Sequence, residues 1–470
     1  MIDQLHTSMK VTSVFFSIII LFCFSGLRVA HAQEELTLEN FLGFVKIYHP
    51  FVKQAQLRLD ASEAKLLKER GAFDPKFTYE KGAKSLDGTA YYEKEQTQVS
   101  IPTLFGLSLS ARMQQAKGNY LDPENQIAGD QLYSFGASLD LARGLLSNPR
   151  QTALKQAKLF AQQAQEENAL EINKILEAAV HAYFEWYKAY RNHEIFDRFV
   201  NNAAFRFEGV KKRNETGDLA VIDTTEARIS YSQRLLDKEN ALLELRKKAL
   251  EASNFLWIEN QPVVLTENAI PQLDQTNFER LFQTESFILE NHPKIRALAY
   301  KQNQLILEQR LQKNNLLPEV NLNYQWLSST NPISQINFAL DPENNTTGLK
   351  VAVPLFLRKE RADLKLATLK LSDMEWEQSQ AKVTLENKIQ ALFIQKERLK
   401  KQELLAKAMA EDYQLLYEGE KRKFEAGESS LFLVNTRESQ LIQAILKSIS
   451  LEVAQRKTEI TYYYSVAFPE

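Results

Sequence analysis

Residues 207–218 read FEGVKKRNETGD, and residues 417–428 read YEGEKRKFEAGE. The two segments align without a gap at an offset of 210 residues (427 minus 217). Each ends a long polar run with heptad-like apolar spacing, carries basic residues and turns at a glycine. Basic side chains complement the dipole at a helix C-terminus, and glycine adopts the left-handed conformation that closes the helix. The pattern therefore predicts two equivalent helical hairpins in a tandem duplication, with tips at Gly217 and Gly427.

A pair of prolines in each half supports the duplication. Pro50 and Pro75 are 25 residues apart, as are Pro293 and Pro318, so both prolines match at an offset of 243 (293 minus 50). Helices are predicted on both sides of the first proline of each pair, over residues 36–72 and 276–315, the second with a capping box at 276–279. Because the tips match at 210, the first half has 33 additional residues (243 minus 210) before its tip.

After each second proline the apolar residues change from helical spacing to alternation. The alternating segments are residues 105–113, 133–141, 320–326 and 347–355, each with one apolar face and one small or polar face. Strands of about 9 to 11 residues with this pattern are typical of membrane β-barrels. A soluble antiparallel sheet shows the same alternation, so the strands alone leave both architectures open. Residues 76–101 could add a weaker hairpin, which would account for the insertion.

Each pair of strands leads into a very long helix, predicted over residues 148–216 and 359–426. At 1.5 Å per residue, such a helix would be roughly 100 Å long. The apolar stripe along each of these helices is narrow and rich in alanine, which suits close packing in a coiled-coil-like wall. Return runs follow the tips over residues 218–257 and 428–464. We therefore expect a first structural repeat over residues 33–260, a linker over 261–275 and a second repeat over 276–470.

The N-terminus has the features of a secretory signal peptide. Residues 11–27 are apolar, a lysine precedes them, and an A-x-A pattern follows at residues 30–32. Cleavage after Ala32 is expected, and a retained membrane anchor is the alternative. Residues 1–32 hold Cys23, the single cysteine, so the mature chain would lack disulfides. Its charge would be -3, from 56 basic and 59 acidic residues after the loss of Asp3, Lys10 and Arg28. This balance argues against a nucleic-acid partner.

No catalytic or cofactor-binding motif is present in the sequence. It has no phosphate-binding loop, nucleophile elbow, zinc-protease helix or dinucleotide glycine fingerprint. The mature chain would keep four histidines, at positions 49, 181, 193 and 292. His49 and His292 precede the repeated prolines, where a turn or packing role is expected rather than metal binding. We therefore expect a protein that is not an enzyme and that needs no cofactor or metal.

The order of these features resembles the TolC family of outer-membrane efflux proteins. The resemblance rests on the duplicated helix, proline, strand pair, long helix and glycine tip, and on the strand end at residues 353–356. It implies a mainly α-helical tunnel and four transmembrane strands per protomer, which a homotrimer completes as a 12-stranded barrel. The sequence itself points to assembly, because four strands cannot close a barrel and open edges cannot face lipid.

The resemblance also implies roles for the tips. Family members receive substrates from an inner-membrane pump through a periplasmic adaptor protein that docks on the two tips. The matching residues here are Gly217, Leu219, Ala220, Ile222, Gly427, Ser430, Leu431 and Leu433. The alternative is that these residues only close each hairpin on itself.

The periplasmic gate of the family matches Asp223, Phe424, Ser429 and Thr436. The match to the family is weaker at these positions. Two lining carboxylates of the best-known member correspond to Leu433 and Thr436 here. Since carboxylate rings select cations, their absence predicts weaker cation selectivity, although Glu428 or Glu438 could substitute.

These features together predict the outer-membrane channel of a tripartite efflux or type I secretion system, a passive exit duct across the outer membrane and periplasm of a Gram-negative bacterium. Its partners would be two further copies of the chain, outer-membrane lipid, a periplasmic adaptor and an inner-membrane pump. A soluble periplasmic coiled-coil adaptor or scaffold is the alternative. The sequence has no pattern specific to one substrate.

Overall fold

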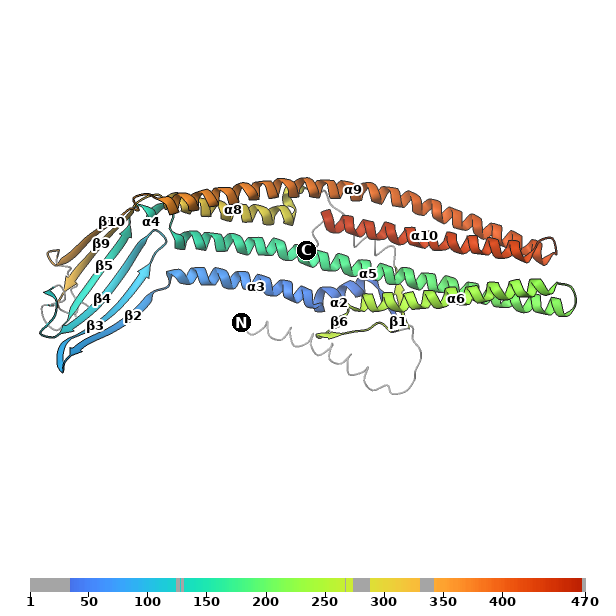
Figure 1. The fold of residues 1–470 in the computed structure, drawn as a ribbon, viewed down its shortest axis with the longest axis horizontal. Coiled ribbons are helices and arrows are strands. Elements are labelled where there is room, and N and C mark those ends of the chain that lie inside the picture. Colours follow the sequence, from blue (N-terminus) through green and yellow to red (C-terminus); the bar gives the residue numbers. More distant parts are fainter. Residues whose placement is uncertain are drawn as a thin grey trace, which may run out of the picture.

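A computed structural model describes residues 34–123, 127, 131–266, 268–273, 288–329 and 342–466. The predicted signal peptide and the capping box at 276–279 lie outside these residues. Within the described ranges, no helix combines the length and apolarity needed to cross a membrane. The chain forms a long rod, with a β-sheet at one end and two helical tips at the other (Figure 1).

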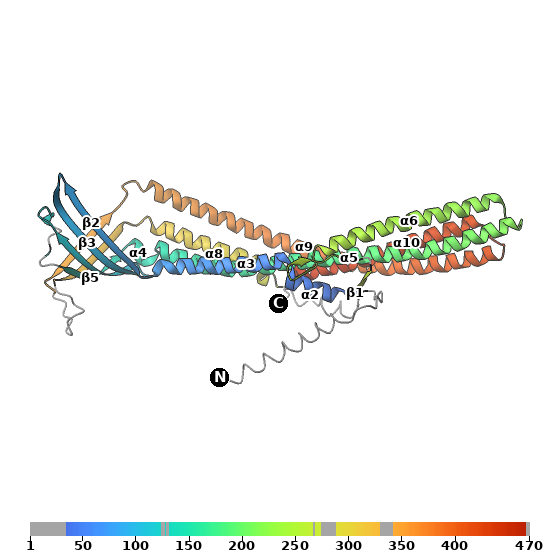
Figure 2. The same ribbon diagram turned by 90° about the horizontal axis from the view of Figure 1, so that it is seen from below.

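Two long helices run through the rod from the sheet to the tips. They are α5 (Pro149–Glu215) and α9 (Arg358–Glu425), each within one residue of its predicted bounds. On the tip side each is paired with its return helix, α6 (Val221–Ser253) or α10 (Leu431–Val466). On the sheet side the partners are α3 (Pro50–Arg70) and α8 (Pro293–Asn314). Four helices therefore lie side by side at either level, as Figures 1 and 2 show.

Local sequence explains where these helices begin. Asn148 caps α5 by accepting a hydrogen bond from the backbone N–H of Gln151 at 2.8 Å. His49 and His292 cap α3 and α8, since the Nδ1 atom of each accepts from a backbone N–H two residues later. A proline follows each of these three caps at the first helical position, where its missing N–H is not needed. The expected turn role of both histidines is thus confirmed.

A compact core lies near the middle of the rod and joins the two halves. Strand β1 (Glu34–Thr37) pairs in parallel with β8 (Ala269–Gln272), and α2 (Leu38–Tyr48) packs against α5. The Tyr183 hydroxyl of α5 is hydrogen-bonded to the carbonyls of Leu36 and Gln272, at 2.8 and 2.6 Å. Because these carbonyls belong to β1 and β8, the part of the predicted linker that forms β8 is held against the helical wall.

The other short elements lie close to the main helices and strands. They are the 3-10 helices at Gly71–Phe73 and Leu289–Asn291, helix α4 (Arg143–Leu146), and strands β6 (Trp257–Ile258) and β7 (Gln261–Pro262).

The sheet contains six antiparallel strands in the order β10-β9-β5-β4-β3-β2. Their bounds are β2 (Lys76–Leu86), β3 (Thr89–Pro102), β4 (Leu107–Lys117), β5 (Leu132–Asp140), β9 (Glu319–Ser328) and β10 (Asn345–Ala352). The four predicted strands are β4, β5, β9 and β10. The weaker hairpin suggested for residues 76–101 is also present, as β2 and β3, so this sheet has six strands rather than four among the described residues.

Two strand ends differ from the prediction for local reasons. β4 begins at Leu107 rather than at Phe105, because Phe105 lies in a turn whose Gly106 has a φ of 72°. β10 ends at Ala352 rather than at residue 355, since Pro354 has no N–H to offer a strand ladder.

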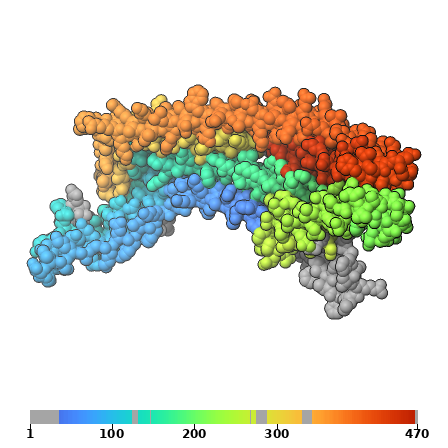
Figure 3. Space-filling view, turned by 45° about the vertical axis from the view of Figure 1, so that its right-hand side comes forward, coloured from blue at the N-terminus to red at the C-terminus, as the bar shows by residue number. Residues whose placement is uncertain are grey.

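Small side chains allow the long helices to pack closely. Ala157 and Ala164 of α5 and Ala227 and Ala241 of α6 are buried at multiples of seven residues. This spacing is that of a coiled-coil seam, as the sequence predicted. The space-filling view shows the resulting slender, curved body, with α9 along one edge (Figure 3).

Candidate functional site at the hairpin tips

The two tips have the same backbone geometry. Gly217 and Gly427 have φ values of 82° and 79°, in the left-handed region that glycine adopts without strain. The N–H of Asp218 donates to the carbonyl of Arg213 at 2.9 Å, and the N–H of Glu428 donates to that of Lys423 at 2.8 Å. Both pairs close the end of a helix in a Schellman motif. The repeated sequence therefore produces repeated structure.

The start of each return helix is fixed differently. The carboxylate of Asp223 accepts from the backbone N–H of Ala220 at 3.1 Å. At the second tip, the Ser430 hydroxyl accepts from the N–H of Leu433 at 3.4 Å. Asp223, Ala220 and Ser430, predicted as gate and docking residues, thus all help to begin a helix.

An apolar cluster holds the two tips together. Val210, Ala227 and Leu431 are buried in it, and Phe207, Leu219 and Phe424 pack around them. Its members come from α5, α6, α9, α10 and the first turn. Leu219, Leu431 and Phe424 therefore pack where the two hairpins meet, an arrangement that neither the docking prediction nor the alternative of self-closure described.

The apolar side chains that remain available at the tips are few. Ile222 is 71% exposed, Phe432 is 64% exposed and Leu433 is 40% exposed. Val221 is also exposed. The first turn of each return helix thus exposes apolar side chains to solvent at the end of the rod. Of the eight predicted docking residues, Ile222 and Leu433 are the ones with large exposed apolar side chains.

The remaining gate residues make contacts within their own hairpin. The Ser429 hydroxyl donates to Glu420, and the Thr436 hydroxyl donates to the carbonyl of Phe432 at 2.8 Å. Glu428 is exposed, whereas Glu438 is fully buried. The suggestion that Glu438 could supply an exposed carboxylate is therefore wrong, because its oxygens are already paired.

A buried ionic cluster joins all four tip-side helices. Glu438 of α10 contacts Arg206 of α5 at 2.5 Å and Arg234 of α6 at 3.2 Å. The hydroxyl of Tyr417, on α9, donates to the same carboxylate at 3.1 Å and accepts from Arg206 at 3.0 Å. Burial and the charge of Glu438 raise the pKa of Tyr417 to about 12, so its hydroxyl stays protonated and can donate. One carboxylate thus links the two hairpins.

The sequence pattern was not enough to predict this cluster, although it held a signal. Arg234 stands seven residues from both Ala227 and Ala241, in the middle of a buried heptad series. Glu438 similarly stands between Val434 and Leu441 on the apolar face of α10. Charged residues at such positions are rarely buried unless paired. An arginine and a glutamate on the apolar faces of neighbouring helices therefore indicate an internal ion pair.

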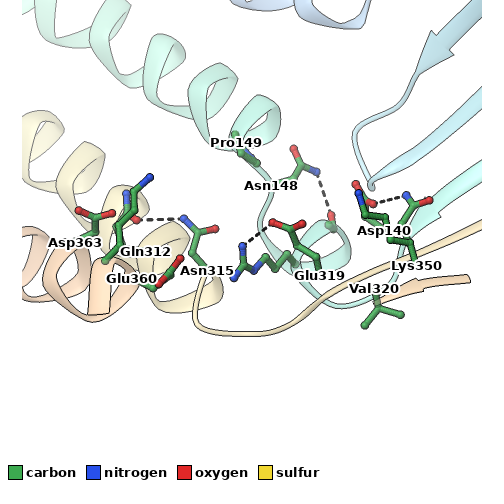
Figure 4. Close-up of a pocket in the computed structure, with 14 residues that line it drawn as sticks. Asp140, Asn148, Pro149, Gln312, Asn315, Glu319, Val320, Lys350, Glu360 and Asp363 are labelled. Carbon is green, nitrogen blue, oxygen red and sulfur yellow. Dashed lines mark hydrogen bonds and ion pairs between the residues drawn. The ribbon is translucent and has the colours of Figure 1, made fainter. Parts of the chain in front are cut away.

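A second polar region lies where the sheet meets the helices (Figure 4). It is a recess of about 700 Å³ whose lining includes Asp140, Glu319, Lys350 and Asp363. Asp140 accepts from the Asn321 amide at 2.6 Å, and Glu319 pairs with Arg143 at 2.9 Å. Because much of this lining is internally paired, we interpret the recess as the joint between sheet and helices. No group of three potential metal ligands occurs in the described part of the chain.

Comparisons with known proteins agree with the fold described above. Residues 286–463 match the protein family described as "Outer membrane efflux protein". No curated protein sequence matches the chain.

Solved structures with the same fold include three channel proteins. The CmeC outer membrane channel of Campylobacter jejuni is 13% identical, with a TM-score of 0.63 over 92% of this chain and 87% of CmeC. CusC, whose structures describe transmembrane channel formation, is 14% identical, with a TM-score of 0.68 over 95% of this chain and 96% of CusC. The open MtrE outer membrane channel of Neisseria gonorrhoeae is 12% identical, with a TM-score of 0.64 over 91% and 88% of the two chains.

The duplicated hairpins, the amphipathic sheet and the family match agree with one another. Residues 286–463 therefore match the outer membrane efflux protein family, and the chain as a whole shares its fold with solved outer membrane channels.

Proposed function

We propose that this protein is the outer-membrane channel of a tripartite efflux system and acts as a passive exit duct. The observation that carries the proposal is the joining of an amphipathic sheet to a long helical rod that ends in two tips. The family match supports a location in the outer membrane of a Gram-negative bacterium, with the rod extending into the periplasm.

The sheet favours a channel over a soluble scaffold. Its apolar face carries Phe135, Tyr324 and Trp326, which are neighbours across β5 and β9. Such aromatic residues suit a membrane interface, whereas a periplasmic scaffold would not need them. One sheet of six strands has open edges, and open edges do not face lipid. A trimer, the assembly implied by the family resemblance, would close them.

The tips are the proposed docking site for a periplasmic adaptor. Ile222, Phe432 and Leu433 offer exposed apolar area on a surface that the hairpins themselves do not cover. Exposed apolar patches at the end of a rigid element commonly mark contacts with a partner protein. The proposed gate is the same region, because the tips would ring the periplasmic end of the duct.

Planar-bilayer recording tests the duct directly. The detergent-extracted protein should give discrete ohmic current steps without any energy source. Its reversal potential should show weak cation preference, because Leu433 and Thr436 carry no charge and Glu438 is buried and paired. Membrane insertion without current steps, under conditions that release the tips, would contradict the duct. Energy-dependent pumping by the isolated protein would contradict its passive character.

A further inference from the structure

The β2–β3 hairpin is a continuous part of the sheet. β2 pairs with β3 from Lys76 to Leu86, and β3 pairs with β4 from Glu93 to Pro102. Both pairings are antiparallel, as are the other pairings in the same sheet. The hairpin therefore extends the sheet that would cross the membrane, and it does not fold back over this sheet.

The two faces of the hairpin continue the two faces of the sheet. On the outer face, Phe77 and Tyr79 of β2 stand beside Val99 and Thr97 of β3. This row continues through β4 as Ala111 and Met113, which belong to the apolar face already described. The helix-side part of the hairpin thus has a surface that is compatible with lipid.

The inner face of the hairpin is polar and hydrogen-bonded across strands. Gln114 of β4 donates to Gln96 of β3 at 3.0 Å, and Arg112 donates to Gln98 at 3.2 Å. These four side chains lie on the face opposite Val99 and Ala111. Such a polar face is typical of a water-filled barrel interior.

Charged residues on the outer face mark where the apolar surface ends. Lys81 of β2 pairs with Glu93 and Glu95 of β3, each at 2.6 Å. Gln115 and Lys117 of β4 stand level with Glu95 and Glu93. The far end of the hairpin therefore belongs outside the hydrocarbon, in the headgroup region or beyond it.

The two edges of the sheet are suited to each other. In the described part of the chain, neither β2 nor β10 has a second neighbouring strand. Successive strands alternate in direction, so β2 leads away from the helices and β10 returns to them. A β2 edge placed beside the β10 edge of another copy would continue the antiparallel order.

The stagger of the strands gives their tilt in a closed barrel. The cross-strand register connects Phe77 of β2, through Val99, Ala111, Phe135 and Trp326, to Asn345 of β10. Asn345 is seven residues from the helix-side end of β10 (352 minus 345), but Phe77 is one residue from that of β2 (77 minus 76). Six residues of stagger over six strands correspond to a tilt of about 35–40°, within the range of barrels.

The helical part gives an estimate of the circumference next to the sheet. On the sheet side, neighbouring helices follow the order α3, α5, α8, α9, which matches the order of their attached strands. Twelve such helices in a trimer would form a ring of about 100–120 Å. Eighteen tilted strands have a circumference of about 105–110 Å, whereas twelve have about 70–75 Å. Eighteen strands are therefore compatible with a ring of twelve helices.

We infer that the assembled channel has an 18-stranded barrel, three copies of six strands, in which β2 of each protomer pairs with β10 of a second copy of the chain. This inference rests on the proposed trimeric outer-membrane channel. It assigns the additional residues of the first repeat to the barrel wall and makes the barrel wider than that of a four-stranded protomer.

Disulfide crosslinking in isolated outer membranes tests the assignment. Glu80→Cys with Gly348→Cys places one thiol on β2 and one on β10, on the inner face of each. Ser110→Cys with Gly348→Cys tests the competing arrangement, in which β4 joins β10 and the hairpin lies outside the barrel. Thr78→Cys and Gly82→Cys, each with Gly348→Cys, cover a shift of register. Position 348 has room for a Cβ, since its nearest neighbour would be the Asn323 Cβ at 3.9 Å.

Within one protomer, none of the four pairs joins adjacent strands. Any disulfide therefore reports a contact between copies. We expect chains with a β2–β10 cysteine pair to migrate at the mass of a dimer and a trimer. Chains with the β4–β10 pair should migrate at the mass of a monomer. Linkage of β4 to β10 alone, or no linkage of any pair in a confirmed trimer, would overturn the 18-stranded barrel. A wild-type chain that is not a membrane trimer would instead overturn the proposed function.

Discussion

At the scale of single residues, Glu438 is the most sensitive position in the tip half. Removing its charge by Glu438→Gln would leave Arg206 and Arg234 buried with reduced compensation. Loss of one partner from a buried ion pair typically lowers the free energy of unfolding by about 3–5 kcal/mol. We expect a loss of this size in denaturant unfolding of the purified protein. Hydrogen exchange should locate the change in α6 and α10.

Glu428→Gln is the matched control for this substitution, because Glu428 is exposed at the tip of the same hairpin. It should change the unfolding free energy by less than about 0.5 kcal/mol. Equal effects of the two substitutions would show that the ionic cluster does not join the hairpins.

His292 should make stability depend on pH. Burial lowers its pKa to about 4, with smaller contributions from Lys294 and Lys388, and a backbone hydrogen bond at Ser465 opposes them. The unfolded chain then binds more protons than the folded chain between pH 4 and 6.5, so stability is lost as the pH falls through this range. At pH 5 the expected loss is about 2 kcal/mol relative to pH 7.5.

His292→Asn keeps a residue that caps helices well and removes the titrating group. Unfolding of the variant, followed at pH 5 and 7.5, should show a smaller pH dependence than the wild type. An unchanged pH dependence would assign it to other groups, such as His49, whose pKa is lowered mainly by burial as well.

At the scale of elements, the turn of each hairpin depends on glycine. Gly217→Val or Gly427→Val would place a β-branched residue at a φ near 80°. The strain should be about 1–2 kcal/mol, confined to the tip, since no atom lies within 4 Å of the added Cβ. Hydrogen exchange should increase around the turn and remain unchanged in the sheet. Gly217→Asn, which tolerates this conformation, should behave like the wild type; equal disturbance by both residues would contradict the account.

The exposed side chains at the start of the return helices should decide adaptor docking. Ile222→Glu and Phe432→Glu replace apolar surface by charge without disturbing the buried tip cluster. Crosslinking to the adaptor and transport should both fall, whereas the mass of the assembly should not change. Ile222→Leu and Phe432→Leu keep the apolar surface and should preserve docking. If both glutamate variants still crosslinked normally to the adaptor, the tips would not be the docking site.

The sequence specified the helices well, because their signals are local. The bounds predicted for α5 and α9 agree with the structure within one residue, because both helices contain few glycines and prolines and end at a glycine turn. The β2–β3 hairpin was less distinct, since Lys81, Glu93 and Glu95 interrupt its apolar face. The packing of Leu219 and Leu431 in one cluster could not be predicted, because it depends on contact between hairpins 210 residues apart in sequence.

At the scale of the whole molecule, the duplication explains the long pass-through helices. Because α5 and α9 span both levels, either end of the rod has four helices per chain, although different helices complete each level. A ring of three chains would then keep a constant number of helices from the sheet to the tips. The open sheet is the part of the molecule that cannot be complete alone, since its edges lack partners in the described residues.

We propose that three copies of this chain together complete a channel in the outer membrane. The most direct measurement separates inner from outer membranes and determines the mass of the detergent-extracted native protein. The account predicts outer-membrane location and the mass of three chains. A monomer released from the periplasm without detergent would contradict it, and the rod would then belong to a soluble scaffold.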